Sequence, residues 1–366
     1  MLRVLFLTEY LTGGGAEKVL CNLVRQMDPA LFEITVQSVW QADPAGLLPS
    51  HVRYRCCHPN TRAARLRFRA EAELGLTYPL HVRDRYDLEV AFHEYAPTKI
   101  LAASANKHAR KIAWVHCDLQ KGTKNPADLP KIEAWYRRFD RIVCVSRSVQ
   151  TVFDAVFSRR LESTVLHNVL DRNAILRKAQ EPIDLPASRR PVVCCVGRLD
   201  VPKNQLRLLE AHRRLLGEGL AHSLWLVGEG PDRGKLEAFL AEHGLSDSVT
   251  LFGFQNNPYP YMKHADLLAC PSDSEGLSTF VSEGLVLGKP ILTTNCGGME
   301  ELLGESEYGL ITDLSDAAFT EGLRRLLQNE KLRTAYADKA LRKANADAEN
   351  SEAKQIEDFL LRTAGK

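Results

Sequence analysis

The segment 265–288 reads A-D-L-L-A-C-P-S-D-S-E-G-L-S-T-F-V-S-E-G-L-V-L-G and predicts a strand, a turn and a helix. Its apolar beginning is typical of a buried strand, and the helix is expected to start at Ser278 or Thr279 and to stop at the last glycine. Two carboxylates, Glu275 and Glu283, lie in the turn and in the helix. A helix that opens just beyond a strand leaves backbone N–H groups at the carboxyl edge of a sheet, where α/β proteins bind anions. The segment therefore predicts an anion site.

Strand-like and helical stretches alternate on both sides of this segment, which favours parallel sheets covered by helices on both faces. The strand-like runs are 2–7, 34–40, 88–92, 111–116, 141–146, 163–167, 192–196, 223–227, 249–252, 265–270 and 291–294. A polar stretch with two prolines, 169–190, is interpreted as a linker. The predicted fold class is α/β, with two doubly wound Rossmann-like domains, 1–168 and 191–345, that face each other across a cleft. A last helix within 346–366 is expected to pack back on the first domain.

The composition is that of a globular enzyme. Of 366 residues, 45% are apolar and 26% are charged, which excludes disordered and fibrous classes. No apolar run reaches the roughly 20 residues of a spanning helix, and 1–7 is too short for a signal peptide, so a cytoplasmic location is expected. The nine cysteines include adjacent pairs and no Cys-x-x-Cys, and several lie in apolar runs. They are interpreted as buried thiols, and no metal site is expected.

Charge divides the chain into a basic front and an acidic back. Residues 1–168 hold 24 Lys and Arg against 17 Asp and Glu, whereas the remainder holds 24 against 29. A basic half is typical of an anionic partner such as a membrane surface, although a solvated surface explains it equally well. Within 61–76, Leu66 and Phe68 alternate with four arginines, Arg62, Arg65, Arg67 and Arg69. This pattern suits an anionic membrane, and the alternative is an ordinary exposed helix.

Two further loops suggest phosphate chemistry. Three glycines, 13–15, follow the first strand, but without the G-x-G-x-x-G spacing of a dinucleotide fold, so a tight turn explains them as well. Just past the strand 192–196, Arg198 and Lys203 stand beside Gly197, which lets the backbone approach a ligand. The flat Arg fork and the mobile Lys charge together suit a diphosphate. The alternative is a loop that faces water.

Six motifs in order resemble those of the retaining glycosyltransferases of family 4, the group 1 glycosyl transferases, which have the two-domain GT-B architecture. The motifs span nearly the whole chain: G-G-G-A-E-K-V-L (13–20), W-V-H-C-D (114–118), V-G-R-L-D-V-P-K-N (196–204), L-V-G-E-G-P (226–231), F-G-F (252–254) and E-G-L-S-T-F-V-S-E-G-L (275–285). One departure is Asn204, where the family most often has Gly after the lysine. An Asn can cap the helix that follows, so only the local loop shape is affected.

The resemblance implies a set of site residues. The implied catalytic residues are Arg198, Lys203, Glu275 and His116. The first two would hold the donor diphosphate and stabilise the leaving group, Glu275 would lie against the hydroxyls of the donor sugar, and His116 would lie beside the reacting sugar. The implied donor-binding residues are Gly14, Gly15, Gly197, Phe254, Gly276, Leu277, Ser278, Thr279 and Glu283. Glu283 would bind the ribose, and the backbone near Phe254 would meet the nucleobase. Without the resemblance, Glu283 is a candidate for a plain exposed helix former and His116 for a hydrogen-bonded core histidine.

The expected function is that of a metal-independent retaining hexosyltransferase. It would move a hexose or N-acetylhexosamine from a nucleotide-diphosphate sugar, with UDP favoured by family habit, to a glycan or lipid-linked acceptor in bacterial surface polysaccharide assembly. No cofactor and no nucleic acid partner are expected, and the basic first domain suggests a peripheral contact at the inner face of the membrane. The alternatives are a nucleotide-sugar epimerase of the same architecture and a non-catalytic partner that binds nucleotide sugar.

Overall fold

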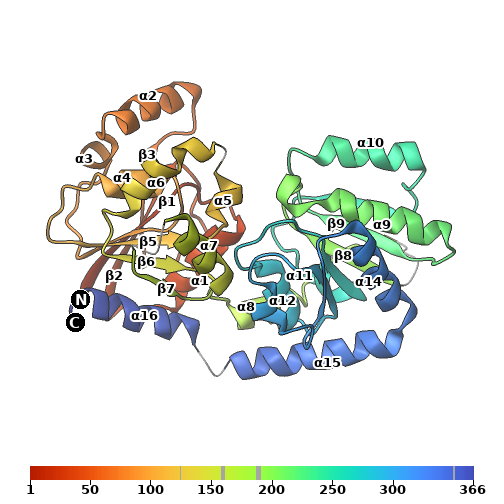
Figure 1. Ribbon diagram of the computed structural model, residues 1–366. Coiled ribbons are helices and arrows are strands. Elements are labelled where there is room, and N and C mark those ends of the chain that lie inside the picture. The colour runs from red at the N-terminus through yellow and green to blue at the C-terminus, as the bar shows by residue number, and fades with distance from the viewer. Residues whose placement is uncertain (124, 158–160, 187–190, 349–350) are drawn as a thin grey trace. The chain divides into compact units, whose positions relative to one another are not determined.

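The computed structural model describes residues 1–123, 125–157, 161–186, 191–348 and 351–366. They form two compact units, one made of Met1–Leu170 and Ser351–Lys366 and the other of Asp171–Asn350. Each unit holds one open parallel sheet with helices around it (Figure 1). Among the described residues, no helix has both the length and the apolar character that crossing a bilayer requires.

The sheet of the first unit has the order β3-β2-β1-β4-β5-β6-β7, and every pair of neighbours is parallel. Its strands are β1 (Leu2–Thr8), β2 (Phe32–Trp40), β3 (Arg53–His58), β4 (Leu88–Ala91), β5 (Arg110–Val115), β6 (Arg141–Cys144) and β7 (Ser163–Val165). The chain order reverses between β1 and β4, which is where doubly wound sheets bind ligands. Strand β3 was not predicted, because R-Y-R-C-C-H lacks an apolar run and lies at the edge of the sheet.

Helices of the first unit follow most of its strands. They are α1 (Gly15–Gln26), α2 (Arg62–Glu73), α3 (Thr77–His81), α4 (Ala96–Ala102), α5 (Leu119–Gly122), α6 (Leu129–Tyr136), α7 (Arg147–Val156) and α16 (Glu352–Thr363), with a 3₁₀ turn at Pro126–Asp128. Although α16 ends the chain, it belongs to this unit, and its Glu357 accepts a hydrogen bond of 2.6 Å from the Asp28 N–H. The chain therefore returns to its first unit after completing the second.

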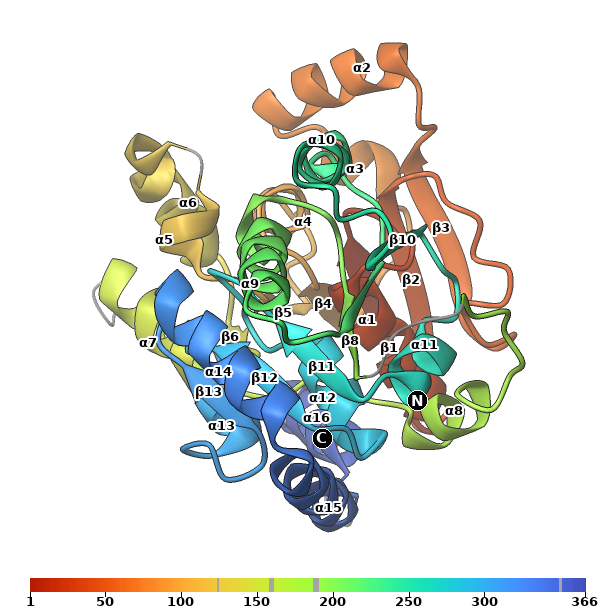
Figure 2. The same cartoon turned by 90° about the vertical axis from the view of Figure 1, so that its right-hand side faces the viewer.

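Helix α2 stands at the periphery of the first unit in both views (Figure 1, Figure 2). Its two fully buried side chains are Ala64 and Glu71, and Phe68 is half-buried. Leu66 on the outer face is 67% exposed, and Arg67 extends along the same helix to bond Glu71. A helix that buries so little apolar surface needs other attachments to the sheet.

The sheet of the second unit has the order β10-β9-β8-β11-β12-β13 and is also parallel throughout. Its strands are β8 (Val192–Val196), β9 (Ser223–Val227), β10 (Val249–Gly253), β11 (Leu267–Cys270), β12 (Ile291–Thr294) and β13 (Leu310–Thr312). The order reverses between β8 and β11, as it does between β1 and β4 in the first unit. The two sheets confirm the predicted pair of doubly wound, Rossmann-like folds.

Helices of the second unit are α8 (Arg172–Lys178), α9 (Gln205–Gly217), α10 (Arg233–His243), α11 (Tyr259–His264), α12 (Thr279–Val286), α13 (Met299–Leu303), α14 (Asp316–Gln328) and α15 (Glu330–Asp347), with a 3₁₀ turn at Val201–Lys203. The predicted linker 169–190 thus contains a helix, capped by Asp171, and its residues 171–186 belong to the second unit. Residues 187–190 lie outside the described residues.

Gly284 lets α12 lie close to the sheet. A Cβ at this position would lie 2.7 Å from Leu268 Cδ1 and 3.1 Å from Ile291 Cδ1, on β11 and β12. The apolar face of the helix is therefore fixed against two strands at once. This contact holds the N-terminus of α12 near the carboxyl edge of the sheet.

A buried pair of histidines links α9 to the N-terminal side of the second sheet. The ring nitrogens His212 Nδ1 and His222 Nε2 are 2.8 Å apart, and His212 Nε2 lies 2.9 Å from Ser248 Oγ. Both imidazoles are almost completely buried. Burial, and then the neighbouring imidazole of His222, lower the pKa of His212 to about 3, and burial lowers that of His222 as well. Both rings are therefore neutral in the folded protein near neutral pH.

We expect the second unit to lose stability in mild acid. Below pH 6.5 the His212 imidazole is protonated in the unfolded chain but stays neutral in the folded protein down to about pH 3. Within this range the free energy of unfolding therefore falls by about 1.4 kcal/mol for each pH unit. Above pH 6.5 this histidine makes stability neither rise nor fall with pH. Urea unfolding at several pH values, followed by the fluorescence of buried Trp225 with the other three tryptophans changed to Phe, measures this slope. His212→Gln should flatten it, and exposed His243→Gln is the control.

Candidate functional site

Two loops meet at the carboxyl edge of the second sheet. Strands β8 and β11 are parallel neighbours, with Val193 opposite Leu267, so the loops that follow them begin side by side. The first loop, 197–204, carries the predicted cations, and the second, 271–278, carries the predicted turn before α12. Because the strand order reverses at this point, the helices after the two strands cover opposite faces of the sheet. A ligand at this edge can therefore reach both loops.

The structure joins Lys203 and Glu275 across the two loops. The Lys203 Nζ lies 2.7 Å from each carboxylate oxygen of Glu275, and Ser272 Oγ donates to Glu275 Oε1 at 2.7 Å. The Glu275 side chain is 8% exposed. Although burial opposes the charge, the Glu275 carboxylate raises the pKa of Lys203 above its usual value. The Lys203 ammonium is therefore charged near neutral pH.

Asn204 and Arg207 hold the two loops in place. Asn204 has φ +44°, accepts from the Arg207 N–H and donates from Nδ2 to Asp273 at 2.9 Å. The predicted helix cap is thus confirmed, and the left-handed backbone explains why glycine would also serve there. Arg207 is 7% exposed, donates to the Pro271 carbonyl at 2.8 Å and forms an ion pair with Asp273 at 2.9 Å. Buried guanidinium bonds of this kind fix the loop before α12.

Arg198 extends from the same edge, and its side chain is 73% exposed. Its Nε donates to Asp200 at 2.6 Å, which orients the guanidinium without burying it. Gly197 before it donates its N–H to the Val227 carbonyl at 3.0 Å. A Cβ on Gly228, which has φ +148°, would lie 1.9 Å from the Gly197 oxygen. The close contact of the β8 and β9 loops therefore requires glycine at position 228.

Glu283 lies inside α12 and not on an exposed face. It is 5% exposed, and its Oε1 accepts a 2.9 Å hydrogen bond from Tyr259 Oη on α11. The interpretation of Glu283 as an exposed helix former is therefore wrong. Burial, and then the Glu283 carboxylate, raise the pKa of Tyr259, which keeps the phenol protonated as a donor. The predicted helix start is confirmed, because Ser278 caps α12 by accepting from the Val281 N–H at 3.4 Å.

The other predicted donor-binding residues of this unit lie at different points of the same edge. Gly276 and Leu277 are buried just before α12, and Thr279 is its half-buried first residue. The Gly276 carbonyl accepts from the Gly298 N–H at 3.1 Å. Phe254 follows β10, is 58% exposed and is separated from β8 by β9. A ligand that spans these residues must therefore extend across several strand ends.

We expect Gly297→Ala to lower turnover without changing any side chain of the site. Gly297 has φ +56°, and its Cβ would lie 2.1 Å from the Glu275 carbonyl oxygen, so the loop that carries Glu275 must move. A displacement of about 1 Å can cost roughly 100-fold in rate. Gly244→Ala is the matched control, because Gly244 has φ +63° and nothing within 4 Å of its Cβ. Equal turnover in the two variants, measured at saturating donor, would contradict the expectation.

In the first unit, the predicted glycines and histidine lie at the carboxyl edge of the first sheet. Gly14 is the N-cap of α1, its N–H donates to Glu17 Oε2 at 3.0 Å, and Gly15 is the first helical residue. His116 follows β5 and is half-buried. Its Nε2 is buried, and no described atom forms a hydrogen bond with it. Burial, and then the neighbouring ring of His93, lower the pKa of His116 well below its usual value.

The sequence did not single out His93 and Glu94, which follow β4 where the strand order of the first sheet reverses. Thr8 Oγ1 lies 2.6 Å from His93 Nδ1. Glu94 is 6% exposed and accepts from the backbone N–H groups of His116 and Cys117, the latter at 2.9 Å. The sequence signal that could have indicated them is their position, because they are two polar residues that directly follow an apolar run. That Gly14, Gly15 and His116 meet a donor held by the second unit stays a prediction.

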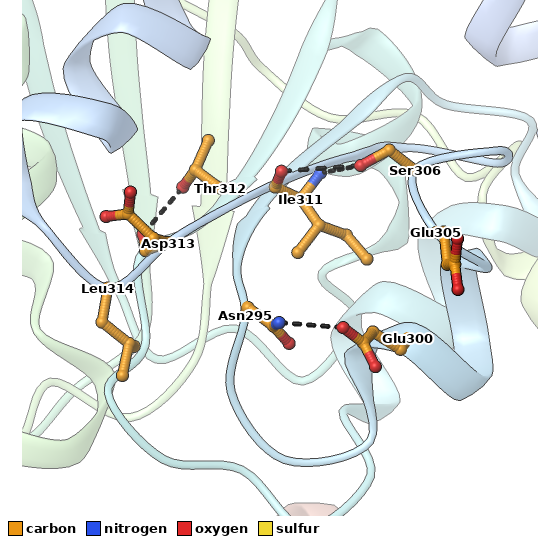
Figure 3. A pocket seen from close by; sticks show the side chains of 8 residues that line it. All are labelled: Asn295, Glu300, Glu305, Ser306, Ile311, Thr312, Asp313 and Leu314. Atoms are coloured by element: carbon orange, nitrogen blue, oxygen red, sulfur yellow. Dashed lines mark hydrogen bonds between the residues drawn. The ribbon is translucent and has the colours of Figure 1, made fainter.

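A separate cavity of about 490 Å³ lies at the ends of β12 and β13 (Figure 3). It is lined by Asn295, Glu300, Glu305, Ser306, Ile311, Thr312, Asp313 and Leu314. The Asn295 side chain donates to Glu300 at 2.9 Å, and the lining holds three carboxylates and no cation. A diphosphate would be repelled there, so this cavity does not replace the Lys203 site as the candidate.

Solved structures identify the class of fold. The chain is similar to HepE from Anabaena in complex with UDP-glucose, with a TM-score of 0.78, 19% identity and 100% of both chains covered. It is also similar to sucrose-phosphate synthase from Thermosynechococcus elongatus, with a TM-score of 0.80, 16% identity and 99% of both chains covered. WaaG, a glycosyltransferase involved in lipopolysaccharide biosynthesis, gives a TM-score of 0.66 at 17% identity over 98% of this chain and 99% of that one. The protein has the GT-B fold.

Residues 177–343, which lie within the second unit, match the family described as glycosyl transferases group 1. The chain is 35% identical to a 4-alpha-N-acetylgalactosaminyltransferase of Campylobacter jejuni over 184 residues, which are 50% of this chain and 49% of that protein. The name of that enzyme includes N-acetylgalactosamine-N,N'-diacetylbacillosaminyl-diphospho-undecaprenol. The lipopolysaccharide core biosynthesis glycosyltransferase LpsE of Rhizobium meliloti is 28% identical over 214 residues, 58% and 61% of the two chains. The matches span about half of these curated relatives.

Proposed function

We propose that this protein is a metal-independent retaining glycosyltransferase. It moves a hexose or N-acetylhexosamine from a nucleotide-diphosphate sugar, with UDP as the nucleotide, to a glycan or lipid-linked acceptor. The observation that carries the proposal is the contact of Lys203 with Glu275 beside the N-terminus of α12. It combines a cation, a carboxylate and a helix N-terminus at one point of the sheet edge. These are the groups that bind a diphosphate joined to a sugar.

Lys203 can hold a phosphate while it stays bound to Glu275. An ammonium has three N–H donors, and two of them are taken by the Glu275 oxygens at 2.7 Å. The third is left for a phosphate oxygen. Arg198, largely exposed at the same edge, supplies a second cation, and the dipole of α12 adds positive potential. Together they stabilise the charge that develops on the leaving phosphate.

Glu275 is proposed to bind the sugar and not to attack it. Its oxygens accept hydrogen bonds from Lys203 and from Ser272, which make the carboxylate a weaker nucleophile but leave Oε2 a lone pair for a sugar hydroxyl. Retention is then achieved on one face of the sugar: the acceptor oxygen bonds to the anomeric carbon as the bond to the phosphate oxygen breaks. The acceptor proton passes to the departing phosphate. Glu283, held by Tyr259, is proposed to bind the ribose hydroxyls.

A lipid-linked or surface-glycan acceptor is suggested by the relatives, one of them named for a diphospho-undecaprenol acceptor and another for lipopolysaccharide core biosynthesis. A cytoplasmic enzyme at the inner face of the membrane suits such an acceptor. Helix α2 offers the contact, because Leu66 is 67% exposed and Leu74 is 71% exposed beside its arginines. Sedimentation with anionic vesicles tests this part. Equal sedimentation with neutral and anionic vesicles would rule it out.

A donor screen tests the enzymatic proposal. Each nucleotide sugar is incubated with the protein, with and without a chelator, and released nucleoside diphosphate is measured. We expect release from UDP-sugars that chelator does not reduce, and a product with the donor's anomeric configuration by NMR. Chelator-sensitive turnover by the wild type, or an inverted product, would refute the mechanism.

The same screen separates the alternatives. An epimerase would convert the nucleotide sugar without an acceptor and without net transfer. A non-catalytic partner would bind the nucleotide sugar and release nothing. The ion pair of Lys203 with Glu275 favours transfer, because a protein that only binds has no need to stabilise a leaving phosphate.

A further inference from the structure

Three side chains from three elements of the first unit converge at one point. His58 ends β3, Glu71 lies in the last turn of α2, and His81 ends α3. The ligand atoms of the three side chains lie within 4.8 Å of one another. Glu71 Oε2 is 2.9 Å from His81 Nε2 and 3.2 Å from His58 Nε2. Two imidazole nitrogens thus face the same carboxylate oxygen.

Hydrogen bonding accounts for only one of these contacts. His81 Nε2 forms a hydrogen bond with Glu71, but the buried His58 Nε2 forms none of acceptable geometry with any described atom. His58 is 2% exposed, and an unsatisfied buried nitrogen is costly. A neutral imidazole has a lone pair on one of its two ring nitrogens. That lone pair faces the centre of the cluster when Nδ1 carries the proton.

The geometry points to a divalent transition-metal site formed by His58, Glu71 and His81, with zinc as the ion we would test. Two neutral imidazoles and one carboxylate are a ligand set that zinc and other first-row ions use in proteins. Ligands about 2.1 Å from a tetrahedral ion lie about 3.4 Å from one another. Two of the three separations between ligand atoms, 2.9 and 3.2 Å, are near that spacing, and the third is within 4.8 Å.

The surroundings also suit an ion. The Glu71 carboxylate lies within hydrogen-bond distance of both Arg67 and His81, which hold it in place. Arg67 donates to the other oxygen, Oε1, at 2.5 Å and fixes the orientation of the carboxylate, as outer partners of metal ligands do. The positive charge of Arg67 beside the site lowers its affinity for a metal cation. His81 is partly exposed, with 14% of its side chain accessible, which leaves a route for the ion.

The site would attach helix α2 to the unit. The centroid of the Phe68 ring lies 5.3 Å from that of Trp40 and 5.6 Å from that of His58. Glu71 is the most buried polar residue of the helix. One ion would tie α2, β3 and α3 together at this point. The attachment is separate from the Lys203 site, which lies in the second unit, so it adds to the proposed function without depending on it.

The test is zinc binding by the untagged full chain after removal of metal, measured by competition with a chromophoric chelator. We expect one zinc per chain, a rise in melting temperature with zinc, and with Co²⁺ a visible spectrum free of thiolate charge transfer. His81→Gln and Glu71→Gln should each weaken binding more than about 100-fold, beyond the 10- to 100-fold that loss of an outer partner costs. His81→Gln keeps a donor for Glu71, so a cluster held by hydrogen bonds alone would tolerate it.

His108→Gln is the control, because His108 is exposed and outside the cluster. It should bind zinc as the wild type does. Circular dichroism of the two ligand variants confirms that they fold, and limited proteolysis at α2 reports loss of the attachment without any activity assay. A wild type that binds no stoichiometric zinc, ligand variants that keep the same affinity, or a cobalt spectrum with thiolate bands would each overturn the proposal.

Discussion

Changing Lys203 to Met is expected to lower turnover by about 100- to 1,000-fold, because it removes one charge that stabilises the leaving phosphate. The substitution also leaves the Glu275 carboxylate, 8% exposed, without its cation. Breaking a buried pair costs about 3–5 kcal/mol and an exposed one less than about 1. Because a third of the Lys203 side chain is exposed, we expect an intermediate loss of stability, about 1–3 kcal/mol. Lost activity alone would therefore not show a role in chemistry.

The double variant Lys203→Met, Glu275→Gln separates the two effects. Neutralising both partners should restore most of the stability, since no unpaired charge remains. Turnover should stay low, because the cation is still missing. Lys235→Met is the control, since Lys235 forms a pair with Asp232 but is 71% exposed and belongs to neither of the two loops. If the double variant regained wild-type turnover, Lys203 would have a structural role only.

Changing Glu283 to Gln is expected to raise the Kd for UDP and the KM for the donor by about 10- to 100-fold. Hydrogen bonds to a charged group contribute about 1.5–3 kcal/mol, and the proposed ribose contacts are of this kind. Gln is preferred to Ala, because its amide oxygen still accepts from Tyr259 and leaves no orphaned phenol in a buried site. Glu283→Ala adds a cavity and an unpaired donor, so it should also lower stability by about 1–3 kcal/mol.

Binding of UDP alone, measured by calorimetry, distinguishes the two carboxylates. If Glu283 binds the ribose and Glu275 the sugar, Glu283→Gln weakens the binding of UDP itself. Glu275→Gln then mainly weakens the additional binding that the sugar contributes. Tyr259→Phe is the matched control, because it removes the supporting hydrogen bond and keeps the carboxylate. An unchanged UDP affinity in Glu283→Gln would exclude the ribose role.

Much of the fold could be predicted from local pattern. The apolar strand, the capping serine and the stopping glycine between 265 and 288 each act within a few residues, so the start of α12 at Thr279 was foreseen. Strand β3 and helix α8 were missed for a physical reason. β3 is an edge strand with charged residues, and α8 is a short helix whose cap, Asp171, falls in a proline-containing polar stretch that reads as a linker.

The candidate site was predictable only in part. Arg198, Lys203 and Glu275 follow strand ends, and neighbouring parallel strands bring such residues together. Tyr259 comes from a short helix that no periodicity marks, and it reaches Glu283 only in the folded unit. The grouping of His58, Glu71 and His81 was not predicted either. These residues come from three different elements, and no short-range spacing in the sequence marks them as neighbours.

The contact of Lys203 with Glu275 also bears on how a transfer cycle would end. After transfer, the nucleoside diphosphate product carries more negative charge than the donor and holds the same ammonium. Glu275 takes two of the three N–H donors of that ammonium, with its oxygens 2.7 Å from the Lys203 nitrogen, so one donor is left for the product. A cation shared in this way binds the product less tightly than an unshared one would, which favours release. The carboxylate that helps to bind the sugar would then also help to clear the site for the next donor.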